Sequence, residues 1–257
     1  MDHLEPPLAG RTVLVTGGNG GIGLGLASGC ANAGARIVLW GRNKEKNDAA
    51  VHELEELGAV AHAFVCDVDD PAAIEEAFAA SVDAAGGRID TVFANAGTSG
   101  NGASFLDLDY EEWRRVMRTN LDGSFLTLQA AARHMVARGG GGSLVAVSST
   151  SAVHGAAHNE AYGTSKTALL GLVRALAVAL ARYDIRVNAL LPGWTVTDLS
   201  APAYAWDKFR EATTTRTPQR RWADPKEMGP AAVFLADPNN TFHTGDTVVV
   251  DGGYTVF

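Results

Sequence analysis

The sequence predicts a doubly wound α/β fold, in which helices cover both faces of one parallel sheet. Seven short runs are nearly continuous in apolar residues, as expected for strands that are buried on both faces. Segments with helical periodicity separate these runs. The chain has 257 residues, 46% hydrophobic and 19% charged, which is enough apolar material for one large core. We therefore expect residues 1–257 to form a single domain around a seven-stranded, Rossmann-type sheet.

Predicted strands and helices alternate along almost the whole chain, which specifies right-handed crossovers between parallel strands. The strands are expected at Thr12–Thr16, Arg36–Trp40, Ala61–Cys66, Thr91–Ala94, Leu144–Ser148, Arg186–Leu191 and Thr247–Val250. The helices are expected at Gly21–Ala33, Lys44–Leu57, Pro71–Ala85, Tyr110–Ala137, Ala161–Tyr183 and Pro225–Leu235. Residues 194–224 interrupt the alternation. An insertion of this length predicts a lid or binding loop, with a packed surface excursion as the alternative.

The charge balance and the hydropathy exclude two classes of partner. The protein carries 21 Lys and Arg against 29 Asp and Glu, a formal net charge of −8. This acidic balance provides no positive field for a phosphate backbone, so we expect no nucleic-acid partner. The most apolar long stretch, Ala168–Ala181, contains Gly171 and Arg174 and is shorter than the roughly 20 residues that cross a bilayer. We therefore expect no membrane partner.

The amino terminus and the cysteines bear on the compartment. Met1–Gly10 lacks the apolar segment of a secretory signal. The two cysteines, Cys30 and Cys66, are far apart in sequence, which is typical neither of a disulfide framework nor of a zinc site. We expect a cytoplasmic protein with packed thiols and no metal site.

A glycine-rich turn joins the first predicted strand to the first predicted helix. Its glycines Gly17, Gly21 and Gly23 follow Thr16, with three residues between the first two. Glycines suit a sharp turn, a close approach of the backbone to a diphosphate and tight packing of helix on strand. The amides at the start of the helix then bind the diphosphate. The turn therefore predicts a dinucleotide site.

The end of the second strand bears on the choice of cofactor. Gly41, Arg42 and Asn43 follow Trp40. In folds that prefer NAD, an acidic residue near this point binds the ribose 2′-hydroxyl, whereas a guanidinium accommodates the 2′-phosphate of NADP. We expect a preference for NADP(H), with NAD(H) still possible. The alternative is that Arg42 is an ordinary solvated side chain.

Three residues form a candidate catalytic group. Tyr162 and Lys166 are four residues apart on a predicted helix, so both project from one face. Ser149 follows the fifth strand, whose carboxyl end faces the ligand crevice of such a sheet. A phenol exchanges protons near neutral pH if its pKa falls by about three units, which requires about 4 kcal/mol. A cation about 5 Å away contributes about 3 kcal/mol at an effective dielectric of about 20. We therefore expect Lys166 to lower the pKa of Tyr162, and Tyr162 to act as general acid or base while Ser149 orients the substrate oxygen.

The complete pattern resembles the short-chain dehydrogenase/reductase family. Besides the glycine turn and the Ser149, Tyr162 and Lys166 set, the matching positions are Asn95-Ala96-Gly97, Asn120 and Pro192-Gly193. The resemblance extends from Thr12 to Gly253. It departs at Ala94, where the family often has a second asparagine. The residues from Arg216 to Pro225 resemble the branch that contains gluconate 5-dehydrogenases and 3-oxoacyl carrier-protein reductases.

The resemblance implies an oxidoreductase that transfers a hydride between NADP(H) and a secondary alcohol or ketone. It implies that Lys166 holds the ribose hydroxyls, Asn120 positions a water, and Asp67 meets the adenine amino group. Asp67 has an alternative role as a helix cap. Asn95 is expected to border the adenosine pocket and Thr197 to contact the carboxamide or diphosphate. The cofactor residues implied are Gly17, Asn19, Gly21, Ile22, Gly23, Arg42, Asp67, Val68, Asn95, Ala96, Gly97, Tyr162, Lys166, Pro192, Gly193, Thr195 and Thr197.

Candidate substrate contacts lie in the insertion and before Tyr162. Trp194, Tyr204 and Trp206 are expected to line an apolar pocket, although aromatic residues in helices also pack in cores. His154 and Ser149 are expected to offer polar contacts to a hydroxylated substrate. The alternative for His154 is a surface position.

Two further function classes remain as alternatives. A regulatory protein that senses NADP(H) without turnover would need the glycine turn but not the catalytic group. Within the enzyme class, the alternative is an NAD-dependent polyol or sugar-acid dehydrogenase. The resemblance also implies a homotetramer, in which long helices pair across a dimer axis. Ala168, Leu169, Leu172 and Leu176 are expected either to form that seam or to face the sheet.

Overall fold

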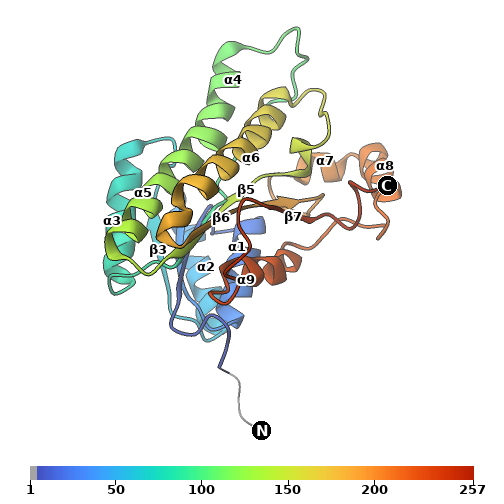
Figure 1. The fold of residues 1–257 in the computed structure, drawn as a ribbon. Helices are drawn as coiled ribbons and strands as arrows, with labels where there is room; N and C mark the ends of the chain where they lie inside the picture. Colours follow the sequence, from blue (N-terminus) through green and yellow to red (C-terminus); the bar gives the residue numbers. More distant parts are fainter. Residues whose placement is uncertain (1–4) are drawn as a thin grey trace.

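A computed structural model describes residues 5–257 and confirms the predicted fold class (Figure 1). The first four residues of the Met1–Gly10 segment lie outside the described residues. All seven strands are parallel and form one sheet in the order β3-β2-β1-β4-β5-β6-β7. The strands are β1 (Thr12–Thr16), β2 (Arg36–Gly41), β3 (Ala61–Val65), β4 (Thr91–Ala94), β5 (Gly142–Val147), β6 (Ile185–Pro192) and β7 (Thr247–Val250).

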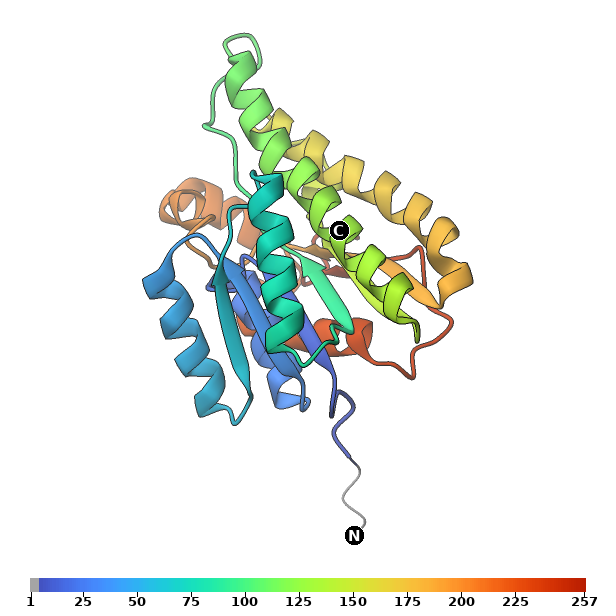
Figure 2. The same cartoon turned by 90° about the vertical axis from the view of Figure 1, so that its left-hand side faces the viewer.

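Helices cover both faces of the sheet, as Figures 1 and 2 show. One face packs against α3, α5 and α6, and the other against α1, α2 and α9. The helices are α1 (Gly21–Asn32), α2 (Lys44–Glu56), α3 (Pro71–Ala84), α4 (Tyr110–Met117), α5 (Gly123–Arg138), α6 (Glu160–Leu180), α7 (Ala201–Ala205), α8 (Asp207–Arg216) and α9 (Gly229–Ala236). Each face therefore has its own buried apolar cluster, which explains why the strands lack an apolar and polar alternation.

Two predicted helices are less regular than expected. The helix expected at 110–137 is divided, because a π-helical turn at Arg118–Asp122 separates α4 from α5. The last predicted helix begins as a 3-10 turn at Pro225–Met228, where Asp224 and Glu227 form a capping box, and continues as α9. The insertion at 194–224 contains α7 and α8, two helices that the sequence did not predict.

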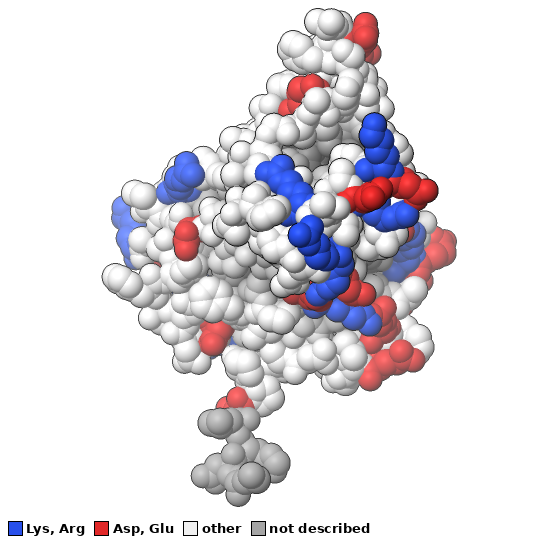
Figure 3. Space-filling model, turned by 90° about the vertical axis from the view of Figure 1, so that its right-hand side faces the viewer, with Lys and Arg blue, Asp and Glu red and all other residues white. Residues whose placement is uncertain are grey.

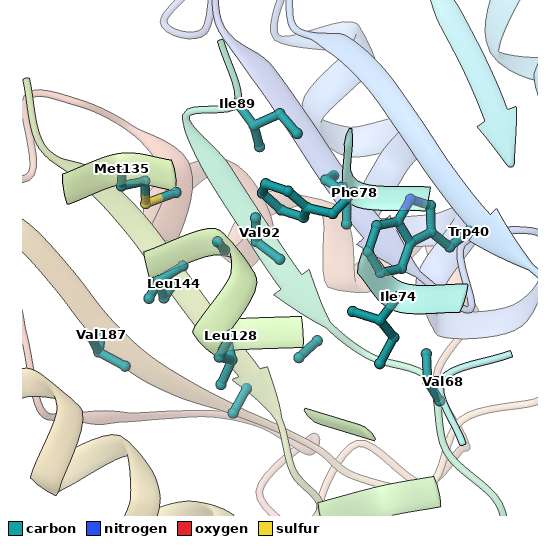
Figure 4. Close-up of a cluster of buried hydrophobic side chains, with 14 of the residues drawn as sticks. Trp40, Val68, Ile74, Phe78, Ile89, Val92, Leu128, Met135, Leu144 and Val187 are labelled. Atoms are coloured by element: carbon teal, nitrogen blue, oxygen red, sulfur yellow. The ribbon is translucent and has the colours of Figure 1, made fainter. Parts of the chain in front are cut away.

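The cluster between the sheet and α3 is anchored by Trp40 (Figure 4). The Trp40 ring is fully buried and meets Phe78 edge to face, with ring centroids 6.2 Å apart. Its indole nitrogen donates a hydrogen bond of 2.8 Å to Ser81 Oγ on α3. Because this buried donor has a partner, the large ring packs without an unsatisfied polar atom. The contact fixes β2 and α3 at the edge of the cleft described below.

The register of the central strands brings four strand ends to one edge of the sheet. Val15 of β1 pairs with Phe93 of β4, and Ala94 pairs with Ala146 of β5. Val147 pairs with Leu190 of β6. The loops after β1, β4, β5 and β6 therefore meet at the carboxyl edge, which is where ligands bind in open α/β sheets.

The helix Glu160–Tyr183, which comprises α6 and the 3-10 turn after it, is long and apolar enough to cross a membrane by length and composition. This differs from the expectation for the shorter stretch Ala168–Ala181. Core helices of folded domains meet the same criterion, and here Leu169 and Val173 of α6 pack against the sheet. Much of the apolar surface of α6 is nevertheless exposed, which bears on assembly below.

We expect the centre of β4 to be sensitive to truncation. Phe93 is fully buried, so Phe93→Ala should lower the free energy of unfolding by about 3–5 kcal/mol through lost burial and a residual cavity. Phe105→Ala is the matched control, because the Phe105 side chain is largely exposed. Denaturant unfolding of both variants measures the difference. Equal stabilities would contradict the assigned burial.

Candidate active site

Two cavities adjoin at the carboxyl edge of the sheet. The first has a volume of about 380 Å³ and extends from the end of β2 past the glycine turn to α6. The second, of about 510 Å³, lies between the loop after β5 and the insertion. Both cavities are lined by Tyr162 and Ser148, and by Ile22, Thr197 and Leu199. Tyr162 thus lies where the two cavities join.

The glycine turn has the backbone geometry that its sequence predicts. Gly17 has a φ of +60°, a conformation that favours glycine, and a side chain at Gly23 would collide with the Gly17 carbonyl oxygen. Asn95 holds the turn to β4 by donating hydrogen bonds to the carbonyl oxygens of Thr16 (2.9 Å) and Gly17 (3.2 Å). The first turn of α1 has neither an acidic side chain nor a side-chain cap. Its amides are therefore available to an anionic ligand.

Basic and acidic side chains gather at the far end of the first cavity. Arg42 is largely exposed, and its guanidinium lies 4.0 Å from the Asp67 carboxylate. Lys46, which the sequence analysis missed, also lines this cavity and forms an ion pair of 2.8 Å with Asp198 of the insertion. Its position four residues after Arg42, in the first turn of α2, was the available signal. The alternative role of Asp67 as helix cap is wrong, because Asp70 caps α3.

Most of the expected cofactor residues line the first cavity. Three expected contacts, Pro192, Gly193 and Thr195, line the second cavity instead, because they follow β6 on the insertion side. Thr195 is also buried, and its hydroxyl donates to the Gly193 carbonyl oxygen at 3.0 Å. The expected residues that line the first cavity are Gly17, Asn19, Gly21, Ile22, Gly23, Arg42, Asp67, Val68, Asn95, Ala96, Gly97, Tyr162, Lys166 and Thr197.

The structure brings Ser149, Tyr162 and Lys166 together. The Tyr162 hydroxyl is hydrogen-bonded to Ser149, which follows β5 and also accepts a hydrogen bond from the Ser151 amide at 3.1 Å. The Lys166 ammonium lies 5.7 Å from the centre of the Tyr162 ring and donates to the Val147 carbonyl oxygen at 2.9 Å. An ammonium has three donors, so two remain for a ligand beside Tyr162.

The pKa values of Tyr162 and Lys166 differ from those expected from the sequence. Burial raises the pKa of Tyr162 above its usual value, and the hydrogen bond with Ser149 only partly opposes this effect. Burial also lowers the pKa of Lys166 to about 8. The expected lowering of the Tyr162 pKa by Lys166 is therefore wrong for this state. The attraction between the two groups favours their charged forms, but the cost of removing both charges from water is larger.

Asn120 lies within the π turn and is fully buried. Its amide oxygen accepts from the Thr98 amide at 2.8 Å, and its amide nitrogen donates to the Thr98 carbonyl oxygen and to Ser165 Oγ, each at 3.0 Å. The side chain thus joins the loop after β4 to α6. The water-positioning role that the resemblance implies remains a prediction.

The second cavity contains some of the expected substrate contacts. Ser149, His154 and Trp194 line it. Tyr204 and Trp206 do not line it, and the expectation for them is wrong. Their rings build the insertion instead, because Tyr204 packs against Trp222 and Trp206 stacks on Phe209.

Several residues of the second cavity were not predicted as contacts. Tyr254 reaches it from the carboxyl-terminal tail, and its ring meets the ring of His154 edge to face, with centroids 5.4 Å apart. Ser99 reaches it from the loop after β4. No local motif marks either residue, since only the fold brings the tail and this loop to the site.

Comparisons with known proteins agree with this arrangement. A family model described as enoyl-(acyl carrier protein) reductase matches residues 17–255. The chain is similar to L-rhamnose 1-dehydrogenase (NAD(P)(+)) of Azotobacter vinelandii, with 38% identity over 97% of this chain and 98% of that protein. It is also 37% identical to gluconate 5-dehydrogenase of Gluconobacter oxydans, over 97% of this chain and 96% of that protein. The chain belongs to the short-chain dehydrogenase/reductase family. As a member, it is an oxidoreductase that acts on alcohol or ketone groups with NAD(P).

Solved structures of the short-chain dehydrogenase/reductase family share the fold. A gluconate 5-dehydrogenase from Burkholderia cenocepacia J2315, in complex with NADP and tartrate, superposes with a TM-score of 0.92 at 36% identity, over 98% of each chain. Levodione reductase superposes with a TM-score of 0.92 at 29% identity, over 97% of this chain and 99% of that one.

We expect the buried ammonium of Lys166 to make stability depend on pH. Its pKa is about 8 in the folded protein and near 10.5 when unfolded, so between these values only the unfolded chain holds the proton. Stability from this group therefore rises with pH across that window. Relative to Lys166→Met, the wild type should gain about 3 kcal/mol in free energy of unfolding from pH 7.5 to 10.5.

Denaturant titrations at several pH values measure this gain. Lys208→Met, which changes an exposed lysine on α8, serves as control and should follow the wild type at each pH. A constant difference between the wild type and Lys166→Met would contradict the lowered pKa.

Proposed function

We propose that the protein transfers a hydride between NADP(H) and a secondary alcohol or ketone, with Tyr162, Lys166, Ser149 and Asn120 as its catalytic group. The observation that carries this proposal is the place of Tyr162, whose ring lies where the two cavities join. One cavity has the features of a dinucleotide site, and the other is enclosed by hydroxyl and aromatic side chains. A proton donor at their junction can act on a substrate oxygen beside a bound cofactor.

The first cavity fits a dinucleotide by its chemistry. The uncapped first turn of α1 offers amides to the diphosphate, and Asp67 and Asn95 border the adenosine end. Lys166 has donors free for the ribose hydroxyls. When bound, the nicotinamide supplies or accepts the hydride, and its oxidised form adds positive charge near Tyr162.

The chain's own residues manage the proton. In reduction, the Tyr162 hydroxyl donates its proton to the carbonyl oxygen, and the raised pKa of Tyr162 keeps that proton available. Ser149 donates a hydrogen bond to the same oxygen and orients it. In oxidation, Tyr162 accepts the hydroxyl proton of the alcohol. This direction requires a lower pKa, so it depends on the charge of Lys166 and of the oxidised cofactor.

Removing the phenol hydroxyl tests this assignment. Tyr162→Phe should fold and bind cofactor, yet lose at least about 100-fold in kcat, because general acid–base catalysis contributes that much. Tyr183→Phe is the matched control at the other end of the same helical segment and should keep full activity. Steady-state oxidation of NADPH measures turnover, and NADPH fluorescence measures binding. A variant that keeps a tenth of wild-type kcat would refute the role of Tyr162.

The preference for NADP(H) is supported by Arg42 and Lys46, the two cations at the far end of the first cavity. Arg42→Ala should lower kcat/KM for NADPH by about 10- to 100-fold, the usual effect of losing a hydrogen bond to a charged group. The value for NADH should change little. Lys44→Ala is the control, because Lys44 pairs with Asp48 and does not line the cavity. A wild type that prefers NADH would instead favour the NAD-dependent polyol or sugar-acid dehydrogenase.

We further propose a homotetramer, supported first by an apolar groove between α5 and α6. The groove has a volume of about 430 Å³ and is lined by Phe125, Val136, Leu176 and Leu180. Of the two positions expected for Leu169, a dimer seam or the sheet, the side chain takes the second and is buried against the sheet. A second surface with exposed apolar side chains surrounds the edge strand β7, with Val249 on one side of the sheet, Phe234 of α9 on the other, and Phe242 in the loop before β7. Two such faces on one chain suit a tetramer with two kinds of contact.

Charged substitutions separate the two contacts. Phe125→Glu in the groove and Phe242→Glu near β7 should each give dimers, and the double variant should give monomers, because a buried unpaired carboxylate opposes association. Sedimentation velocity at micromolar concentration measures the mass against the 26.8 kDa chain. A monomeric wild type would contradict the proposal.

We also propose a cytoplasmic location, which suits the two free, buried cysteines.

A further inference from the structure

The two cavities differ sharply in charge. Charged side chains line the first cavity, where Arg42, Lys46, Asp67, Lys166 and Asp198 lie. Within residues 5–257, no lysine, arginine, aspartate or glutamate lines the second cavity. A ligand there would lose its hydration without gaining a counter-ion, and for a carboxylate this exchange is costly.

Among residues 5–257, the charged groups near the second cavity lie outside its lining. Arg115 lies behind Ser99 and holds Glu112 at 2.7 and 2.8 Å, so the pair has no net charge. Arg216 lies over the Tyr254 ring, 4.4 Å from its centre, and does not line the cavity. The amino end of α6 carries the positive end of the helix dipole, and the Glu160 carboxylate in its first turn offsets that charge. The Arg115 pair therefore offers no net charge to a carboxylate, and Arg216 keeps its charge but lies against the Tyr254 ring, outside the residues that line the cavity.

The cavity wall nevertheless contains polar atoms that need partners. His154 Nε2 and Trp194 Nε1 are buried and find no hydrogen-bond partner among residues 5–257. The amide nitrogen of Asn159 donates to Ser99 Oγ at 3.3 Å. The buried atoms of His154 and Trp194 have almost no accessible surface, so a ligand can pair with them only after the His154 or Trp194 side chain turns toward the cavity. The hydroxyl groups of Ser99, Ser149 and Ser151 also line the cavity, and a purely apolar ligand would cover them without offering a hydrogen bond, which is unfavourable. A ligand with several hydroxyl groups can pair with them.

Aromatic rings complete the wall. Trp194 is held by a stacked contact with Trp222, at 4.8 Å between centroids, and by an edge contact with Phe209 at 5.1 Å. Tyr254 lies against His154. Rigid rings of this kind pack against the C–H surface of a sugar or polyol while polar atoms at their edges bind hydroxyls.

We propose that the substrate is an uncharged compound with several hydroxyl groups, a polyol or sugar, and that the enzyme discriminates against the sugar acid of the same carbon skeleton. His154 is the specificity-determining residue that binds a substrate hydroxyl away from the reacting carbon. This inference rests on the proposed function, since it concerns the substrate of the same reaction.

Matched pairs of substrates test the discrimination. Galactitol and galactonate, sorbitol and gluconate, and xylitol and xylonate each differ by a terminal hydroxymethyl or carboxylate group. With NADP⁺, kcat/KM for the polyol should exceed that for the acid by at least about 100-fold in pairs that react. Cyclohexanol, uncharged but with one hydroxyl, should be a poorer substrate than the best polyol.

Variants test the residues. His154→Phe keeps an aromatic ring but removes the polar nitrogens, and should lower kcat/KM for polyols by about 10-fold more than kcat/KM for cyclohexanol, while the Kd for NADPH stays unchanged. His52→Phe, on the exposed face of α2, is the matched control.

Ala157→Lys places a cation at the exposed rim of the second cavity and should raise kcat/KM for the sugar acids by about 10-fold.

The outcomes separate this inference from the proposed function. Sugar acids that react as well as their polyols, or cyclohexanol that reacts better than every polyol, would overturn the inference while leaving the proposed function intact. Equal losses for polyols and cyclohexanol in His154→Phe would reject His154 as a specificity residue. Binding of NADPH without turnover of any alcohol or ketone would reject the proposed function, and the inference with it.

Discussion

The ammonium of Lys166 is buried beside the phenol of Tyr162, and its one hydrogen bond within residues 5–257 goes to the backbone of β5. Burial opposes both the charge on Lys166 and the loss of a proton from Tyr162. The pair is therefore held by the rest of the fold: α6 presents both side chains, β5 presents the Val147 carbonyl, and the packed sheet keeps the two elements in register. A bound cofactor adds contacts that the protein alone does not provide.

Much of this arrangement followed from sequence. Continuous apolar runs separated by segments of helical periodicity predicted the sheet and the parallel direction of its strands, because strands that are buried on both faces are apolar along their whole length. The glycine turn and the spacing of Tyr162 and Lys166 identified residues that line the first cavity, since both motifs are local. Tyr254 and Ser99 could not be found in this way, because only tertiary packing brings them to the second cavity. The prediction for Tyr204 and Trp206 was wrong, because aromatic side chains pack on one another at the surface of the insertion as readily as they line a pocket.

The surface is consistent with a small-molecule enzyme. On the face seen in Figure 3, basic side chains are interspersed with acidic ones and form no extended basic patch. Basic and acidic side chains also pair at and after α8, as Arg210 with Asp207 and Arg221 with Glu227. The charges that bear on ligand recognition lie inside the first cavity. The fold thus keeps a charged environment for one ligand apart from an uncharged environment for the other, with Tyr162 between them.

The π turn at Arg118–Asp122 has a consequence for how this chain tolerates changes in length. Each residue of an α-helix rotates the side-chain direction by about 100° around the axis. The wider π turn therefore rotates the side chains of α5 relative to those of α4. Deleting one residue there would let the two helices fuse into one regular rod. Phe125 and Leu128 would then rotate together, Asn120 would leave Thr98 and Ser165, and the loop after β4 would lose its anchor. A single-residue deletion that a surface loop absorbs would here disturb both the core and the site.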